Sequence, residues 1–233
     1  MKRFYKTVRA EPAEGGGWRI LLDGREVKTP ARRTLVAPAR ALADAVVAEW
    51  EGQGEEVQPA TMPLTRALNS ALDRVEPERD AVLADLAGYA GSDLLCYRAE
   101  SPEELVARQR AAWDPLLDWA REVHGLRLTL TEGVMPVAQP DGTGTRARAL
   151  LEPLDAARIA ALHAFVTITG SFVLGLAVIH RRIGWEQAWT LSTLDEDWQA
   201  GLWGRDAEAE ARAARRRAEM ETAGRLLDLL DAG

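Results

Sequence analysis

The sequence is poor in cysteine, and this scarcity limits the kinds of site that it can build. Cys96 is its only cysteine, which excludes an intramolecular disulfide and a cysteine-rich zinc site. Only three histidines are present, His124, His163 and His180, and they form no His-Glu-x-x-His motif. We therefore expect no metal site, and the cysteine content suits a reducing compartment.

Long apolar runs are also missing. The most apolar stretch lies near residues 172–179, far short of the roughly 20 residues that a membrane-spanning helix needs. The first residues, Met1 to Lys6, contain neither an apolar signal core nor a long amphipathic presequence. These absences favour a soluble, cytoplasmic protein of bacterial type without membrane insertion.

The chain has no surplus of positive charge and no motif of a cofactor site. Its net charge is −7, whereas a general nucleic-acid binder needs a basic footprint, so nucleic acid is not an expected partner. The glycines at 15–17 are not followed by the Gly-Lys-Ser/Thr of a phosphate-binding loop. Ser171 does not lie in a Gly-x-Ser-x-Gly motif. We therefore expect no cofactor and find no recognisable catalytic set.

What the sequence does contain is a strand-rich beginning. Four short segments have the character of strands: 4–9, 18–22, 25–28 and 34–37. The dipeptide Asp23-Gly24 between two of them is typical of a two-residue hairpin turn. Apolar residues at steps of four from Leu42 to Trp50 predict a helix. The sequence thus predicts a small α+β domain over residues 1–62 with a sheet that contains a β-hairpin.

From residue 63 onward the apolar periodicity is mostly helical. Ser101 to Glu104 has the pattern of a capping box, and Pro115 predicts a kink or break in the helix that follows. Alternating leucines at 126–130 suggest a strand. Four further helices are expected over about 155–166, 171–183, 185–203 and 206–230.

The fold class that follows is α+β. Strands come first and helices afterwards, which argues against a doubly wound fold. We expect a larger, mostly helical C-terminal domain over residues 63–233. Segment 126–138 is expected to pack on the first domain or to rejoin its sheet.

One segment combines acidic residues with tryptophan. Between Asp195 and Glu210 there are six acidic residues and one basic residue. On a helix, steps of three and four place five residues on one face: Trp189, Thr193, Glu196, Ala200 and Trp203. An acid on such an aromatic face must be paired, hydrogen-bonded or left for a partner. Gly204 is expected to end this helix, and Asp206 to cap the next one.

Three interpretations of these acids remain open. In the first, Asp206 and Glu208 favour a helix start and Glu196 pairs with a nearby arginine. In the second, the acids and tryptophans form a protein-binding patch. In the third, Asp195 joins these three acids in paired-carboxylate chemistry, as in a hydrolase or a metal-dependent enzyme. A general scaffold or holdase is a further alternative.

Several segments together resemble one known family. In chain order they are Lys2–Lys6, Leu22–Arg25, Lys28–Pro30, Leu42–Trp50 with Gln53, Met62–Thr65, Asp73-Arg74, Ser92–Tyr97, Trp113–Pro115 and Trp203–Glu208. This ordered set resembles the assembly chaperones that act on the alpha subunit of F-type ATP synthase, the family of the mitochondrial ATP synthase assembly factor two. Each segment alone is weak evidence for the family. The ordered set is specific, because the segments span nearly the whole chain.

The resemblance implies a chaperone without enzymatic activity. It would bind the free alpha subunit and shield its subunit interface until the beta subunit replaces it. In the family, an acidic residue within a Leu-acid-Glu-acid-aromatic-Gln segment is linked to function, and Glu196 matches that position. The expected client-binding residues are Glu196, Trp203, Asp206, Glu208, Asp195 and Trp198. Gly204 would set the turn that presents them.

Overall fold

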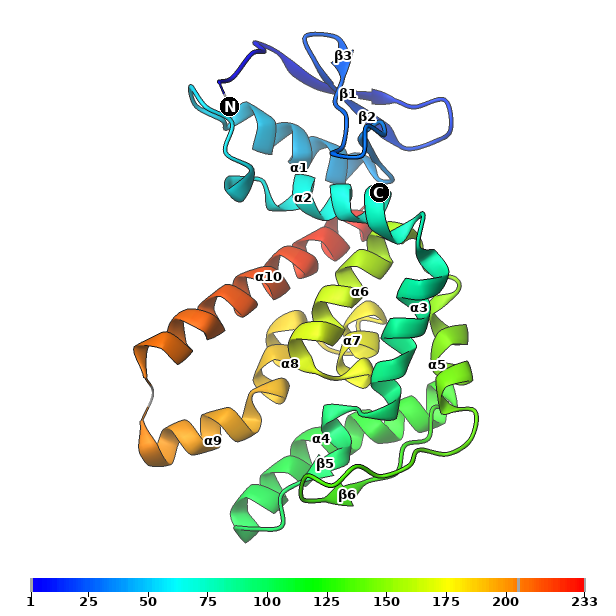
Figure 1. Cartoon of the computed structure of the whole chain (residues 1–233), viewed down its shortest axis with the longest axis vertical. Coiled ribbons are helices and arrows are strands. Elements are labelled where there is room, and N and C mark those ends of the chain that lie inside the picture. The colour runs from blue at the N-terminus through cyan, green and yellow to red at the C-terminus, as the bar shows by residue number, and fades with distance from the viewer. Residues whose placement is uncertain (1, 205, 233) are drawn as a thin grey trace. The chain divides into compact units, whose positions relative to one another are not determined.

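The computed structural model describes residues 2–204 and 206–232 (Figure 1). The chain divides into two compact units, each built from separate stretches of sequence. Unit 1 contains the residues up to Arg79, the segment Asp155–Ala161 and the C-terminal segment from Thr222. Unit 2 contains Asp80–Leu154 and Leu162–Glu221. The domain boundary expected between residues 62 and 63 stays a prediction.

Unit 1 opens with a four-stranded antiparallel sheet. Its strands are β1 (Val8–Pro12), β2 (Trp18–Leu22), β3 (Arg25–Glu26) and β4 (Val36–Ala37), and β2 pairs with each of the other three. Asp23 and Gly24 have φ angles of 48° and 79°. Positive φ at both central positions is what a tight hairpin turn requires, so the hairpin prediction is confirmed. The first strand begins at Val8 rather than at residue 4.

Two helices follow the sheet in unit 1, as the apolar periodicity predicted. They are α1 (Arg40–Glu51) and α2 (Pro63–Ser70); the 3-10 turn η1 (Pro59–Thr61) precedes α2, and the π-helical turn η2 (Ala71–Val75) follows it. Glu49 of α1 accepts hydrogen bonds from the backbone N–H groups of Leu64 and Thr65 at 2.7 and 2.8 Å. The side chain of one helix therefore satisfies the free N–H groups at the start of the next.

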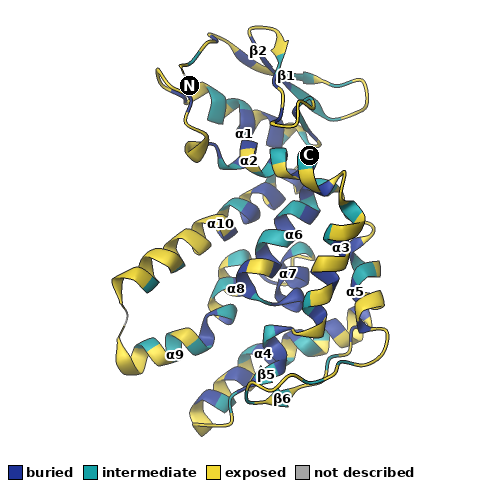
Figure 2. Ribbon diagram, viewed as in Figure 1, coloured by how far each residue is buried: buried dark blue, intermediate teal, exposed yellow. Residues whose placement is uncertain are grey.

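Unit 2 is mainly helical. Its elements are α3 (Arg79–Gly88), η3 (Tyr89–Gly91), η4 (Leu94–Cys96), β5 (Tyr97–Arg98), α4 (Glu103–His124), β6 (Thr131–Glu132), α5 (Thr143–Leu151), α7 (Phe172–Ile179), α8 (Trp185–Ser192), α9 (Leu194–Trp203) and most of α6 (Ala156–Thr169) and α10 (Ala207–Asp231). Helix α7 is buried from Phe172 to Val178 (Figure 2). A Cβ on Gly175 would lie 2.6 Å from Val166 Cγ2, so glycine permits the close contact with α6.

One buried carboxyl group joins two elements of the unit 2 core. Asp93 accepts hydrogen bonds from Ser171 Oγ at 2.8 Å, from the Val173 N–H at 2.9 Å and from the Leu95 N–H at 3.0 Å. Ser171 Oγ in turn accepts a hydrogen bond from the Leu174 N–H. Asp93 therefore helps to cap both η4 and α7. Burial raises the pKa of Asp93 to about 6.

The predicted capping box of the long helix α4 is wrong, and Pro115 does not break the helix; the alternative of a kink at that point stays a prediction. The helix starts after Pro102, an extended residue without a side-chain cap hydrogen bond, so no capping box forms. Pro115 lies inside the helix, which continues to His124. Proline removes one backbone hydrogen bond there. However, buried Trp113 donates from Nε1 to the Leu191 carbonyl at 2.9 Å, so contacts made elsewhere in unit 2 hold the helix together.

Two other expectations also need correction. The leucines at 126–130 form no strand; the strand β6 begins at Thr131 and pairs in parallel with β5, within unit 2, rather than with the first sheet. The helix expected over 185–203 is divided into α8 and α9 at Thr193, where φ is −99° and ψ is 12°. Among the described residues, no helix combines the length and the apolar character needed to cross a bilayer.

Candidate functional site

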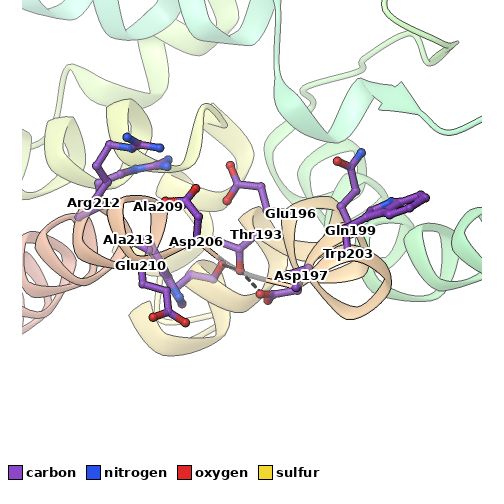
Figure 3. A pocket seen from close by; sticks show the side chains of 14 residues that line it. Thr193, Glu196, Asp197, Gln199, Trp203, Asp206, Ala209, Glu210, Arg212 and Ala213 are labelled. Carbon is purple, nitrogen blue, oxygen red and sulfur yellow. Dashed lines mark hydrogen bonds between the residues drawn. The ribbon is translucent and has the colours of Figure 1, made fainter.

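The predicted face of acidic and aromatic residues lines a groove on unit 2. The groove has a volume of about 430 Å³ and lies between α9 and the first turns of α10 (Figure 3). All five residues of the predicted face line it: Trp189, Thr193, Glu196, Ala200 and Trp203. The Thr193 N–H donates to the Trp189 carbonyl, and the Asp197 N–H donates to the Thr193 carbonyl. These bonds keep helical spacing across the division between α8 and α9, so the five residues still lie on one face.

Gly204 shapes one end of the groove. It follows the last residue of α9 and has φ 82° and ψ 173°, a conformation that is open almost only to glycine. Its N–H still donates to the Ala200 carbonyl at 2.9 Å. The expected helix end at Gly204 is therefore confirmed, while the role of its turn in presenting the acids stays a prediction. The turn brings Asp206, Glu210 and Arg212 of the second wall opposite α9.

Glu196 projects from the first turn of α9 and is exposed. In the part of the chain that the structure describes, its carboxylate has no hydrogen bond or ion pair. The interpretation in which Glu196 pairs with a nearby arginine is thus not supported within these residues. The position still favours an acid, because negative charge stabilises the N-terminal end of a helix.

Asp206 is the cap of α10, as predicted. Its Oδ1 accepts hydrogen bonds from the N–H groups of Glu208 and Ala209, at 2.7 and 3.0 Å. These bonds hold the pKa of the Asp206 carboxyl below its usual range. The capping uses only one of the two carboxylate oxygens, and Asp206 also lines the groove.

The other predicted site residues lie outside the groove lining. Asp195 accepts a hydrogen bond of 2.7 Å from Nε2 of buried Gln109, so it fastens α9 to α4. Glu208 forms an exposed ion pair of 2.6 Å with Arg212. Trp198 is half-buried. The structure therefore brings Glu196, Trp203 and Asp206 together; the client-binding role of all six residues stays a prediction.

Two apolar side chains near the end of α9 are exposed, and one of them, Trp203, lines the groove. Trp203 is 86% exposed and the neighbouring Leu202 is 63% exposed, both in the last turn of α9. Sequence reasoning missed Leu202 as a surface residue, and it also missed Glu210 and Arg216 of the second wall. Arg216 lies 5.8 Å from the ring of Trp189 and donates to the Ile168 carbonyl. No local pattern predicts a contact between residues this far apart in the chain.

The acids do not gather into a metal centre. Within residues 2–204 and 206–232, no group of three or more histidine, cysteine or carboxylate side chains is placed to hold a metal ion. Two histidines do meet elsewhere, since the rings of His124 and His180 lie 4.5 Å apart beside Trp119. Burial lowers the pKa of both imidazoles. Neither histidine lines the groove.

Comparison with known proteins places the chain in a family. The model of a family described as ATP12 chaperone protein matches residues 2–121, about half of the sequence. The chain belongs to the ATP12 chaperone family. This membership confirms the resemblance to the ATP synthase assembly chaperones that the ordered segments indicated.

Relatives of this ATP12 chaperone support both the family and the fold. The mitochondrial protein atp12 of Schizosaccharomyces pombe is 26% identical over 215 residues, covering 87% of this chain and 74% of the relative. The crystal structure of Atp12 from Paracoccus denitrificans is 46% identical, with a TM-score of 0.94 and 98% of each chain covered. The Atu1473 protein of Agrobacterium tumefaciens is 46% identical, with a TM-score of 0.91, 98% of this chain and 86% of that one covered. The α+β fold class predicted from the sequence is confirmed.

Proposed function

We propose that this ATP12-family protein binds the free alpha subunit of F-type ATP synthase and shields its subunit interface until the beta subunit takes its place. The observation that carries the proposal is the groove between α9 and α10 in a member of a chaperone family. The family resemblance links Glu196 to function. Glu196 lines this groove, is exposed, and has no hydrogen-bond or ion-pair partner among the described residues.

The chemistry of the groove suits a protein partner. Exposed tryptophan is costly in water, and tryptophan is enriched among the residues that dominate protein interfaces. Trp203 therefore fits a surface that is covered in a complex. The charges around it would favour one orientation and one partner. A net charge of −7 would help to keep a complex with an aggregation-prone client in solution.

The proposal gives the protein a binding role and no enzymatic activity. It acts on a newly made subunit, and we infer that it does so in the bacterial cytoplasm, in keeping with its bacterial relatives. Release requires that beta bind alpha more tightly than the chaperone does. A moderate affinity for alpha is therefore part of the proposal.

The direct test is binding of purified alpha subunit to wild-type protein and to Glu196→Lys. Because Glu196 is exposed and unpaired among the described residues but lies in the first turn of α9, the lysine should lower the melting temperature by no more than about 4 °C and weaken binding at least about tenfold. Calorimetry or surface plasmon resonance gives the affinity. Glu219→Lys, an equal charge change on an exposed residue of α10, is the matched control.

Three results would contradict the proposal. If the wild-type protein does not bind alpha, the proposed function itself is wrong. Wild-type protein that suppresses the aggregation of unrelated proteins as well as that of alpha would favour a general holdase. If both lysine variants bind alpha as wild type does, the groove is not the binding site.

A further inference from the structure

The positive charges of the groove are already engaged within the protein. Arg212 pairs with Glu208 on the same helix at 2.6 Å. Arg216 donates to the Ile168 carbonyl and lies over the ring of Trp189. Neither arginine forms an ion pair within 4.0 Å with an acid of the groove lining among the described residues, although the charge of Arg212 helps to lower the pKa of Asp206. The two basic side chains in the lining are thus directed to other partners.

Two of the four acidic residues in the groove lining, Glu196 and Asp206, have fewer partners. Glu196 makes no side-chain contact of hydrogen-bond or ion-pair type in the described chain. Asp206 uses Oδ1 for the cap of α10, and Oδ2 accepts no hydrogen bond from a described residue. These two carboxylates come from the two walls of one groove, Glu196 from α9 and Asp206 from the start of α10 (Figure 3).

An aromatic surface lies in the same groove. Trp203 ends α9 and is 86% exposed, and Ala200 lies one turn before it. A purely apolar segment that filled this groove would bury the Glu196 carboxylate without a partner among the described residues, which is costly. It would also bury Asp206 Oδ2, whose charge is offset only by the cap bonds to Oδ1 and by the nearby charge of Arg212. An acidic segment would place like charges together. The arrangement therefore selects a partner that presents both positive charge and apolar surface.

We propose that the groove binds a segment of the alpha subunit in which an arginine or lysine side chain stands next to apolar residues. The cationic group lies between Glu196 and Asp206 Oδ2, and the apolar neighbours pack on Trp203. This inference rests on the proposed function and adds Asp206 as a specificity-determining residue. The cap of α10 and the recognition of the client thus use different oxygens of one carboxylate.

The first experiment uses isosteric variants and the alpha subunit as the ligand. Glu196→Gln removes one charge at an exposed position. Asp206→Asn removes the other, and because asparagine caps helices as well as aspartate does, the cap is retained. Each variant should weaken alpha binding by roughly tenfold and should lower the dependence of the affinity on salt. Glu219→Gln, outside the groove lining, should bind as wild type does.

The outcomes separate this inference from the proposed function. If wild type binds alpha and all three glutamine or asparagine variants bind equally well, the charge recognition is wrong while the chaperone function stands. If only Glu196→Gln weakens binding, Asp206 is not a specificity residue and the two-carboxylate site is overturned. Thermal melts of each variant show whether the α10 cap has been kept.

A second experiment does not depend on the alpha subunit. Short fluorescent peptides carry a central arginine, lysine, norleucine or glutamate between leucines, and their binding is followed by fluorescence anisotropy. The arginine and lysine peptides should bind at least about tenfold more tightly than the norleucine and glutamate peptides. Asp206→Asn should reduce this preference. Equal binding of the cationic and norleucine peptides to wild type would overturn the inference.

Discussion

At the scale of single residues, Asp93 shows how far folding can alter one group. It is fully buried, and the desolvation of its charge raises the pKa from 3.8 to about 6 despite four hydrogen bonds that favour the charged form. The folded state therefore holds this proton more tightly than the unfolded chain does. The resulting stabilisation is present below about pH 4 and is lost as the pH rises through 6.

The variant Asp93→Asn isolates this effect, because every other group titrates in both proteins. Between about pH 4 and pH 7, the wild type should lose about 2 kcal/mol of unfolding free energy relative to the variant. Asparagine also changes the hydrogen bonds to Ser171 and Val173, but that cost does not depend on pH. Urea unfolding at both pH values measures the difference. A difference that is the same at both would show that Asp93 titrates normally.

Residue type alone did not show which acids of the 195–208 segment have partners within the protein and which are free to bind a client. Asp195 and Glu196 are neighbours and equally acidic, yet one is hydrogen-bonded to buried Gln109 and the other has no partner among the described residues. The sequence predicted that Glu196 lies on an aromatic face, since that follows from helical spacing. It could not show the role of Asp195, because Gln109 is 86 residues away in the chain.

At the scale of elements, periodicity predicted where helices lie better than where they end. The expected helices at 155–166 and 206–230 correspond to α6 and α10. The division at Thr193 was missed, and the helix continues through Pro115, where a kink or a break was expected. Each depends on packing between segments that are distant in sequence, such as the bond from Trp113 to the Leu191 carbonyl. Local propensity cannot report such contacts.

The turn at Gly204 is the element-scale feature that shapes the groove. Alanine at this position would be strained, because a Cβ disfavours φ 82° with ψ 173°. Gly204→Ala should therefore cost about 1–3 kcal/mol or shift the two helices relative to each other, and in either case weaken alpha binding while Glu196 and Asp206 remain present. Calorimetric melting and the alpha-binding assay measure both effects. Gly201→Ala, in the same helix with open space around it, is the control.

A melting temperature and an affinity that both match those of the control would contradict this prediction. They would mean that the groove does not need the glycine turn. A lower affinity with an unchanged melting temperature would agree with it, because the strain would then be relieved by movement of the helix ends that form the groove.

At the scale of the whole molecule, the proposed function is an exchange of partners. The chaperone and the beta subunit are expected to cover the same surface of alpha, so they cannot occupy it together. Addition of beta subunit to a purified chaperone–alpha complex should release free chaperone in proportion to the beta added, because the proposed exchange requires that alpha bind beta more tightly than it binds the chaperone. Gel filtration with subunit-specific staining follows the release. A stable complex of all three proteins would contradict the shielding mechanism.

The construction of unit 1 has a consequence for the order of synthesis. This unit contains the first residues of the chain and also the segment from Thr222, whose Leu226, Leu227 and Leu230 are buried. Within the same unit, Arg158 binds Asp231, 73 residues later, at 2.6 Å. On the ribosome, all of unit 2 leaves the exit tunnel before these last residues do. Unit 1 is thus begun before unit 2 and finished after it, and a translation product that stops between residues 216 and 222 would contain every groove residue without a finished unit 1.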